Sequence, residues 1–280
     1  MQIISKIQEI QNIINLVKKQ NKTIGFVPTM GALHQGHISL IKKSMEECQY
    51  NVVSIFVNPA QFGPGEDYEK YPRSIEADIK ILQKENIDIL FVPTTEEMYQ
   101  KNFGTWINVE KISEVFEGKL RPGHFCGVCT IVGKFFNIIQ PDKSYFGWKD
   151  AQQLIIIKKM VKELNIPVKI IGMTTIRDKD GLALSSRNTY LSPEGRKKAT
   201  CLYKSLHKMW EMVIYNSITD TEILLEEGKK IILKESVKID YLEVINLSNF
   251  KPVKKIEKQT GIIGAVRIDN VRLIDNIIWE

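Results

Sequence analysis

The stretch that decides the fold is residues 23–37, which read TIGFVPTMGALHQGH. Its first six residues form a short apolar run that ends at Pro28, and a run of this kind is typical of a buried β-strand. Gly31 permits a tight turn after the strand. Beyond the turn, apolar residues recur at the spacing of one helix face: Ile38, Ile41, Met45 and Cys48. The stretch therefore predicts a buried strand, a tight turn and a helix that starts at about His37.

The same alternation of strand and helix continues through the first two-thirds of the chain. Further strands are expected at residues 51–57, 87–92, 144–146 and 168–171, and helices around 7–17, 74–86, 128–139 and 150–164. Strands that alternate with helices favour an α/β fold, in which helices cover both faces of a parallel sheet. Ligands of such sheets bind beyond the carboxyl ends of the strands, so the chemistry is expected in the loops there.

The pattern changes after about Met173. Long helices are expected at 193–215 and 219–235, followed by strands at 239–244, 262–268 and 271–278. Asp269-Asn270, between the last two strands, is a good hairpin turn. This order predicts a second, smaller α+β domain, and we divide the chain into residues 1–175 and 176–280.

Composition excludes some classes of protein. The 280 residues are 43% hydrophobic and 26% charged, which is ordinary for a soluble globular chain. The net charge of +6 is mild and scattered, so it suits a small anionic substrate better than a nucleic acid. We expect neither a secretory leader nor a bilayer-spanning run, and we therefore expect a cytoplasmic protein with no membrane partner.

The H-x-G-H sequence from His34 to His37 is the strongest chemical signal. It directly follows the predicted strand and turn, where unpaired N–H groups and the positive end of a helix dipole attract phosphate. Gly36 would let the phosphate approach, and both imidazoles could donate to its oxygens. Histidines that merely cap the helix are the structural alternative. A zinc site lacks an evident third ligand, and the P-loop pattern is absent from the sequence.

Four other clusters carry weaker signals when taken alone. FGWKDAQQ (146–153) offers Lys149 as a cation for phosphate, or is simply the start of a helix. GLALSSRN (181–188) offers two hydroxyls and an arginine for phosphate, or is a polar loop. NPAQFG (58–63) offers Gln61 to a carboxylate, or is a plain connection. RPGHF (121–125) adds positive charge through Arg121 and His124, as either a structural loop or an active-site lid.

A C-x-x-C pair, Cys126 and Cys129, lies in a run that reads as a buried helix. A zinc site needs a second pair of ligands, which is not nearby, and a redox site is the other alternative. We favour two small residues, one helical turn apart, that face the core.

Taken together, these clusters resemble the pantoate–β-alanine ligase family over nearly the whole chain. The most specific pieces are PTMGALHQGH, FVNPAQF, YPRS, RPGHF, QPDKSYFGWKDAQQ and DGLALSSRN. H-x-G-H alone indicates only the wider nucleotidyltransferase group.

The resemblance implies a reaction in two steps. The pantoate carboxylate attacks the α-phosphate of ATP, which gives pantoyl adenylate and pyrophosphate, and the β-alanine amine then displaces AMP to give pantothenate, a coenzyme A precursor. The resemblance also implies Mg²⁺ with the nucleotide, a homodimer, a Rossmann-type N-terminal domain that binds ATP and pantoate, and a smaller C-terminal domain that partly covers the site as a lid.

The resemblance also assigns roles to residues. His37 is the expected proton donor, and the catalytic set is His34, His37, Lys149 and Arg187. Gln61 and Gln153 match the pantoate-binding glutamines, with Gln61 also near β-alanine. Asp78 lies where magnesium contacts are found. The ATP-binding positions are Met30, Gly31, Ala32, Leu33, His34, Gln35, Gly36, His37, Gly147, Trp148, Lys149, Asp150, Ile176, Leu184, Ser185, Ser186 and Arg187.

Two other functions stay open at this point. Another H-x-G-H nucleotidyltransferase would transfer a nucleotide to a phosphate or alcohol and would not need Gln61 and Gln153. A nucleotide-sensing or nucleic-acid-binding protein without catalysis is disfavoured by the scattered charge and the lack of an aromatic–basic stripe.

Overall fold

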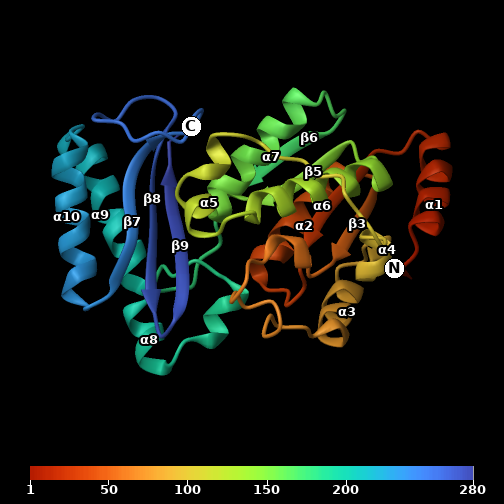
Figure 1. The fold of residues 1–280 in the computed structure, drawn as a ribbon, viewed down its shortest axis with the longest axis horizontal. Helices are drawn as coiled ribbons and strands as arrows, with labels where there is room; N and C mark the ends of the chain where they lie inside the picture. Colours follow the sequence, from red (N-terminus) through yellow and green to blue (C-terminus); the bar gives the residue numbers. More distant parts are fainter. Residues whose placement is uncertain (280) are drawn as a thin grey trace. The chain divides into compact units, whose positions relative to one another are not determined.

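The structure is a computed structural model that describes residues 1–279 (Figure 1). The chain separates into two compact units. The larger unit contains Met1–Gly147 and Gln152–Met173, and the smaller contains Trp148–Ala151 and the chain from Thr174 onward. The short segment 148–151 thus packs with the later part of the chain. The division into domains 1–175 and 176–280 stays a prediction, because compactness does not show that each part folds alone.

A six-stranded sheet forms the centre of the larger unit, in the order β1-β4-β3-β2-β5-β6, and every pairing in it is parallel. Its strands are β1 (Gln2–Ile4), β2 (Ile24–Thr29), β3 (Tyr50–Ile55), β4 (Ile89–Phe91), β5 (Lys143–Gly147) and β6 (Lys169–Met173). The predicted α/β fold is confirmed. The chain moves from β2 toward one edge and then restarts with β5 on the other side of β2. The strand order therefore reverses at β2, which is where ligands of such sheets bind.

Helices cover both faces of this sheet. The helices that begin in this part of the chain are α1 (Ile7–Lys19), α2 (Gln35–Glu47), α3 (Ile75–Lys84), α4 (Thr95–Met98), α5 (Glu117–Leu120), α6 (His124–Ile139) and α7 (Ala151–Glu163), with short 3₁₀ turns η1 (Pro59–Gln61) and η2 (Ile112–Glu114). On one face, Val27 packs in one apolar cluster with Ile41 of α2 and Leu82 of α3. On the other face, Phe26 meets Phe135 of α6 with ring centroids 5.5 Å apart. Successive residues of a strand point to opposite faces, so neighbouring residues of β2 anchor helices on both sides.

Three local predictions for this unit were wrong. β1 was not expected, because three residues carry no readable period and a helical pattern follows at once. The helix after the turn begins at Gln35 rather than at about His37, because His34 already caps it. The helix expected from 128 begins at His124, so the end of RPGHF is the first turn of α6 rather than a loop.

The smaller unit is α+β, as predicted. Its antiparallel sheet has the order β7-β8-β9, with β7 (Lys238–Asn246), β8 (Thr260–Ile268) and β9 (Val271–Ile278). The other elements are η3 (Trp148–Asp150), η4 (Ser186–Tyr190), α8 (Pro193–Lys198), α9 (Thr200–Asn216) and α10 (Thr221–Lys234). The predicted hairpin turn is present, since Asp269 and Asn270 have positive φ of 51° and 64°. Leu206 of α9 and Leu224 of α10 pack with Ile262 of β8 in the core.

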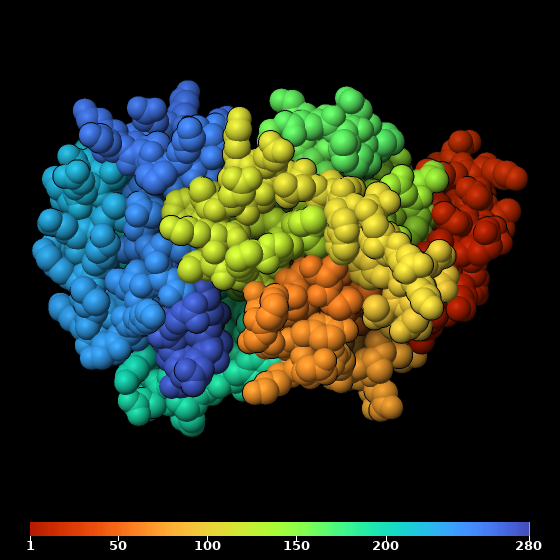
Figure 2. Space-filling model, in the orientation of Figure 1, coloured from red at the N-terminus to blue at the C-terminus, as the bar shows by residue number. Residues whose placement is uncertain are grey.

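One exposed segment and the lengths of the helices complete the description. The segment that follows η1, residues 62–73, is largely accessible and forms part of the orange region in Figure 2. Among residues 1–279, no helix has the length and apolar character needed to cross a bilayer.

Candidate active site

The turn after β2 is held by a carboxylate from α3. Gly31 and Ala32 both have positive φ, 81° and 50°, and this conformation is unfavourable for alanine. Asp78, which is 2% exposed, accepts the backbone N–H of Ala32 and that of Leu33, each at 2.8 Å. The Thr29 hydroxyl also accepts the N–H of Gly31 at 3.2 Å. These contacts compensate for the backbone strain and fix the path of the ATP-binding turn predicted from the sequence.

His34 and His37 cap the helix that follows the turn. His34 is the N-cap of α2, and its Nδ1 accepts the N–H of Gly36 at 3.1 Å. The Nδ1 of His37 in turn accepts the N–H of His34 at 3.3 Å, and the ring centroids are 4.1 Å apart. A nitrogen that accepts carries no proton, so each neutral ring carries its proton on Nε2. Capping thus fixes the tautomer of both neutral rings, in which Nε2 is the donor.

The structure adds a steric role for Gly36 to the predicted one, which stays a prediction. A Cβ at this position would lie 2.8 Å from Cε1 and 2.9 Å from Nδ1 of His34. Gly36 is therefore required so that the capping imidazole can fold over the first turn of α2.

Gln61 contacts the predicted ATP-binding turn directly. Its Nε2 donates to Met30 Sδ at 3.0 Å, and its Oε1 accepts from Asn58 Nδ2 at 3.1 Å. Asn58 is itself fixed by Tyr99, whose hydroxyl donates to Asn58 Oδ1 at 2.8 Å, and by the carbonyl of Gly127. The glutamine predicted to hold a carboxylate thus lies beside the turn predicted to hold ATP.

The backbone of Gln61 is held by residues 121–125 (RPGHF). The sequence predicted that this segment supplies positive charge. His124 Nδ1 lies 2.8 Å from the Gln61 carbonyl, and Arg121 Nη1 lies 3.1 Å from His124 Nε2. Because a guanidinium can only donate, Nε2 accepts and Nδ1 donates. Burial, together with the Arg121 charge, lowers the pKa of His124 to about 4. His124 is therefore neutral near pH 7, and the prediction that it adds charge was wrong. Arg121 is paired with Glu66 at 2.5 Å.

The two adjacent glutamines at the start of α7 differ in role. Gln152 is buried; its Oε1 accepts the N–H of Glu117, and its Nε2 donates to the carbonyls of Ile112 and Val115. Gln153 is partly exposed. Gln152 therefore supports the η2–α5 segment, and Gln153 is the one accessible to solvent. The predicted contact of Gln153 with pantoate stays a prediction.

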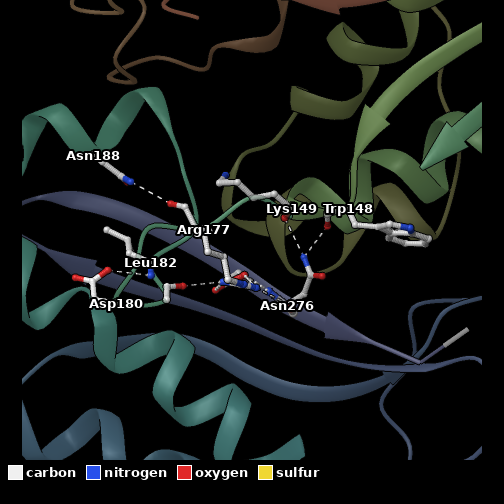
Figure 3. A network of polar contacts seen from close by, with 10 residues as sticks. Trp148, Lys149, Arg177, Asp180, Leu182, Asn188 and Asn276 are labelled. Carbon is white, nitrogen blue, oxygen red and sulfur yellow. Dashed lines mark hydrogen bonds and ion pairs between the residues drawn. The ribbon is translucent and has the colours of Figure 1, made fainter. Parts of the chain in front are cut away.

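Of the other predicted ATP-binding residues, Trp148–Asp150, Ile176 and Leu184–Arg187 belong to the smaller unit. Figure 3 labels Trp148 and Lys149 of the first segment. In the first, Lys149 Nζ lies 3.6 Å from the half-exposed Asp150 carboxylate. In the second, the N–H of Leu184 donates to the carbonyl of Ile176 at 3.0 Å, so these two predicted positions are neighbours. Ser185 caps η4 by accepting the N–H of Arg187 at 3.3 Å.

Sequence reasoning missed Asn276, which donates from its side-chain amide to the carbonyls of Trp148 and Lys149. A signal was present, because Asp275-Asn276 interrupts an apolar run, between Leu273-Ile274 and Ile277-Ile278. Sequence reasoning also missed that Asp78 clamps the turn. Its predicted contact with magnesium stays a prediction, and among residues 1–279 no group of three or more His, Cys, Asp or Glu side chains is arranged to hold a metal ion.

The C-x-x-C pair divides between core and surface. Cys129 is fully buried, as expected, and burial raises the pKa of its thiol to about 12. Cys126 is partly exposed, so it does not face the core as expected.

Comparison with known proteins agrees with this geometry. The profile of the family described as pantoate-beta-alanine ligase matches residues 2–278. The chain belongs to the pantoate–β-alanine ligase family. It is 49% identical to a pantothenate synthetase of Caldicellulosiruptor saccharolyticus and 49% identical to one of Thermosipho africanus, with 99–100% of each chain covered.

Solved structures of the family have the same fold. A pantothenate synthetase of Thermus thermophilus superposes with a TM-score of 0.94 at 42% identity, over 99% of both chains. A pantoate-beta-alanine ligase of Francisella tularensis, described as a complex with beta-gamma ATP and β-alanine, superposes with a TM-score of 0.84 at 39% identity, over 99% of this chain and 97% of that one. The resemblance found in the sequence is confirmed, and the roles of individual residues stay predictions.

Proposed function

We propose that this chain condenses pantoate with β-alanine in an ATP-dependent reaction, and that pantoyl adenylate is the intermediate. The contact between Gln61 Nε2 and Met30 Sδ carries the proposal. It puts a residue suited to a carboxylate beside a turn suited to a phosphate, and adenylation of a carboxylate requires these two groups to meet. Membership of the ligase family over residues 2–278 supports the same reaction.

The proposed first step joins two anions. A carboxylate oxygen of pantoate attacks the α-phosphorus of ATP, the bond to the β-phosphate bridging oxygen breaks, and pyrophosphate leaves. The N-terminus of α2 stabilises this charge through its dipole, and the Nε2–H groups of His34 and His37 donate to phosphate oxygens. Because both Nδ1 atoms accept backbone N–H groups, neutral imidazoles suffice for this role.

In the second step the amine of β-alanine attacks the acyl carbon, and AMP leaves with the oxygen that came from pantoate. Adenylation is needed because an unmodified carboxylate has no adequate leaving group. We assign the side-chain amides of Gln61 and Gln153 to pantoate, where they supply donors and acceptors for its carboxylate and hydroxyl groups. The glutamine pair distinguishes an acid-activating ligase from a nucleotidyltransferase that acts on a phosphate or alcohol.

Lys149, Ser185, Ser186 and Arg187 are proposed to hold the triphosphate. Lysine offers a compact positive charge, and a guanidinium offers two parallel donors to phosphate oxygens. Replacement of Lys149 by alanine is expected to lower the adenylation rate by roughly 10² or more, as removal of one preorganised charged contact typically does.

Mg²⁺ is proposed to enter with ATP. The ion usually binds through substrate phosphates and one or two carboxylates, and it would neutralise charge on the phosphates when bound. Each Asp78 oxygen accepts one backbone N–H, and a carboxylate oxygen has a further lone pair, so the residue fits one additional contact. We further propose that the enzyme acts as a homodimer in the cytoplasm.

An isotope experiment tests the whole sequence of steps. Pantoate labelled with ¹⁸O in its carboxylate is incubated with ATP, Mg²⁺ and β-alanine, and AMP is analysed by mass spectrometry. Transfer of one ¹⁸O to AMP, together with pantoate-dependent exchange of pyrophosphate into ATP, is expected. Release of ADP and phosphate would contradict an adenylate, and nucleotide transfer to an alcohol would favour a different nucleotidyltransferase.

A further inference from the structure

Two adjacent polar side chains are buried in the outer strand of the smaller unit's sheet. Asp275 and Asn276 of β9 are 5% and 6% exposed, between the apolar residues Ile274 and Ile277. A buried polar group destabilises a fold unless its hydrogen bonds are satisfied, and a buried charge does so unless it is paired. Asn276 meets this condition through Trp148 and Lys149 of one segment assigned to ATP. Asp275 meets it through Arg177, which directly follows Ile176 of the other.

Asn276 holds the segment that carries Lys149. Its Nδ2 donates to the Trp148 carbonyl at 2.8 Å and to the Lys149 carbonyl at 2.9 Å (Figure 3). Both amide protons are therefore used on consecutive carbonyls of η3. A lysine side chain has a flexible stem of four carbons, so its ammonium is positioned well only if its backbone is fixed. Asn276 supplies this restraint.

Asp275 connects the same strand to the second ATP segment through Arg177. Arg177 Nη1 lies 2.5 Å from Asp275 Oδ2, and Nη2 lies 2.8 Å from Oδ1, which is a two-pronged charged contact. The guanidinium also donates to the carbonyl of Gly181 at 3.1 Å and to that of Asn276 at 3.3 Å. One arginine thus joins β9 to the start of the run that leads to Arg187.

The loop between Arg177 and Arg187 has little freedom to take another path. Gly181 has φ of +93°, and a Cβ there would lie 2.0 Å from Cδ1 of Tyr203. The Arg177 guanidinium lies over the same ring, 4.3 Å from its centroid. Asn188 Nδ2 donates to the Ala183 carbonyl at 3.0 Å at the far end of the loop. The loop is therefore fixed at both ends, with β9 as its support.

We propose that Asn276 is a positioning residue, held in place by the Asp275–Arg177 pair, which sets Lys149 and the Leu184–Arg187 run at the spacing that one ATP molecule requires. The inference rests on the proposed function, because that function assigns both segments to the triphosphate. Charged contacts stabilise a transition state strongly only when they are placed before the substrate binds. The buried amide and ion pair provide this placement without touching ATP.

The test compares Asn276→Leu and Asn276→Asp with a matched control, Asp240→Asn. Leucine and aspartate keep the approximate size of Asn276 but remove its N–H donors. Asp240 belongs to the same sheet; its side chain is 5% exposed and accepts from Arg267 and Arg272. The control therefore measures the effect of damaging a buried ion pair of this sheet in general. Thermal unfolding of all variants checks that they fold.

The expected result is a selective loss of ATP recognition. Both Asn276 variants should raise the KM for ATP by about 10-fold and lower kcat by about 10-fold, as loss of preorganisation typically does, while the KM for pantoate changes by less than about twofold. Asp240→Asn should leave the KM for ATP within about twofold of wild type. An equal rise in the KM for ATP in Asn276→Leu and in the control would overturn the inference.

A double-mutant cycle with Lys149→Ala measures whether the effects of the two substitutions on ATP affinity are coupled. A purely structural role of Asn276 would give no such coupling. If Asn276 acts through Lys149, then Asn276→Leu should have little further effect on ATP affinity, measured by calorimetry, when Lys149 is already alanine. Fully additive losses would contradict the inference. If wild type binds ATP but releases no AMP with pantoate and β-alanine, the proposed function fails, while the calorimetric cycle still decides the role of Asn276.

Should Asn276→Leu not fold, Arg177→Lys is the second variant. Lysine keeps the charge of Arg177 but not its two-pronged contact with Asp275, so this variant is expected to weaken ATP binding in the same selective way.

Discussion

Asp78 and Leu33 are joined by a hydrogen bond of 2.8 Å from the Leu33 backbone N–H to the Asp78 carboxylate, 45 residues away in the sequence. The second carboxylate oxygen accepts the N–H of Ala32, whose φ is +50°. The turn that precedes α2 is therefore held in its conformation by a residue of α3. Asp78 thus has one observed role, to hold the turn, and one proposed role, to contact magnesium. The two roles can be tested separately.

Replacement of Asp78 by asparagine is expected to impair the turn. The new amide would direct an N–H toward a backbone N–H, so we expect the free energy of unfolding to fall by about 1–3 kcal/mol and kcat/KM for ATP to fall about 10-fold or more. Urea unfolding and steady-state kinetics measure the two effects. Asp88→Asn is the matched control, because Asp88 accepts the backbone N–H of Asn51 at 2.7 Å in another part of the sheet. An unchanged turn with a large increase in the Mg²⁺ requirement would favour the metal role instead.

The tautomers of the two site histidines can be measured. Because Nδ1 of both rings accepts a backbone N–H, ¹⁵N NMR should show neutral His34 and His37 protonated at Nε2. We expect His37→Ala to lose roughly 10² or more in adenylation rate. Loss of the capping contact should lower the free energy of unfolding by only about 0.5–2 kcal/mol.

His207 provides the control for that measurement. It is partly exposed on α9 and lies 3.5 Å from Glu211, so His207→Ala should keep the wild-type rate. Adenylation at a near wild-type rate by His37→Ala, or an Nδ1-protonated spectrum, would refute the assigned role.

Substitution can separate the proposed roles of Gln61 and Gln153 from the structural role of Gln152. Gln61→Ala and Gln153→Ala should weaken pantoate binding by about 10-fold and ATP binding much less, because each removes hydrogen bonds to the acid substrate. Gln152→Ala should instead reduce stability, since this side chain holds Glu117 and two carbonyls of the η2–α5 segment. Calorimetric titration of each variant with pantoate and with ATP measures the difference. Equal losses for both ligands would argue against the glutamine pair.

The buried imidazole of His124 predicts a pH dependence of stability. Its pKa is about 4 in the folded protein, below its ordinary value of about 6.5. Between these values the unfolded chain binds more protons, so stability rises with pH, and the contribution present above pH 6.5 is lost as pH falls toward 4. The groups that affect the ring are Arg121, which lowers its pKa, and Glu66, Glu117 and the Gln61 carbonyl, which raise it.

The shift corresponds to about 3 kcal/mol over that interval. Chemical unfolding of wild type and His124→Gln at intervals from pH 7 to pH 4 measures it. We expect the variant to show a much flatter profile between pH 6.5 and 4. A slope as steep as that of wild type would mean that other groups cause it. Below pH 4.5 protonation of Glu47 adds a separate loss, because its hydrogen bonds with Lys143 and Lys43 lower its pKa to about 2.

Sequence patterns alone were enough to predict the parallel sheet, the smaller α+β unit, the hairpin at Asp269-Asn270 and the position of the H-x-G-H turn. These features are readable because periodicity, turn chemistry and capping depend on residues close together in the chain. The family was readable because several long motifs follow one another in a fixed order. Local signals were insufficient for β1, which is too short to show a period, and for the start of α6.

The contacts that hold the candidate site residues could be read only from the folded chain. It showed that Asp78 clamps the turn, that His124 is neutral, that Gly36 accommodates the His34 ring and that Asn276 binds the backbone of Lys149. These contacts join residues up to 128 positions apart or depend on burial, and neither sequence spacing nor residue type specifies them. Residue type indicates which hydrogen bonds and charges are available, whereas packing decides which partner each group meets and whether a charge can form there.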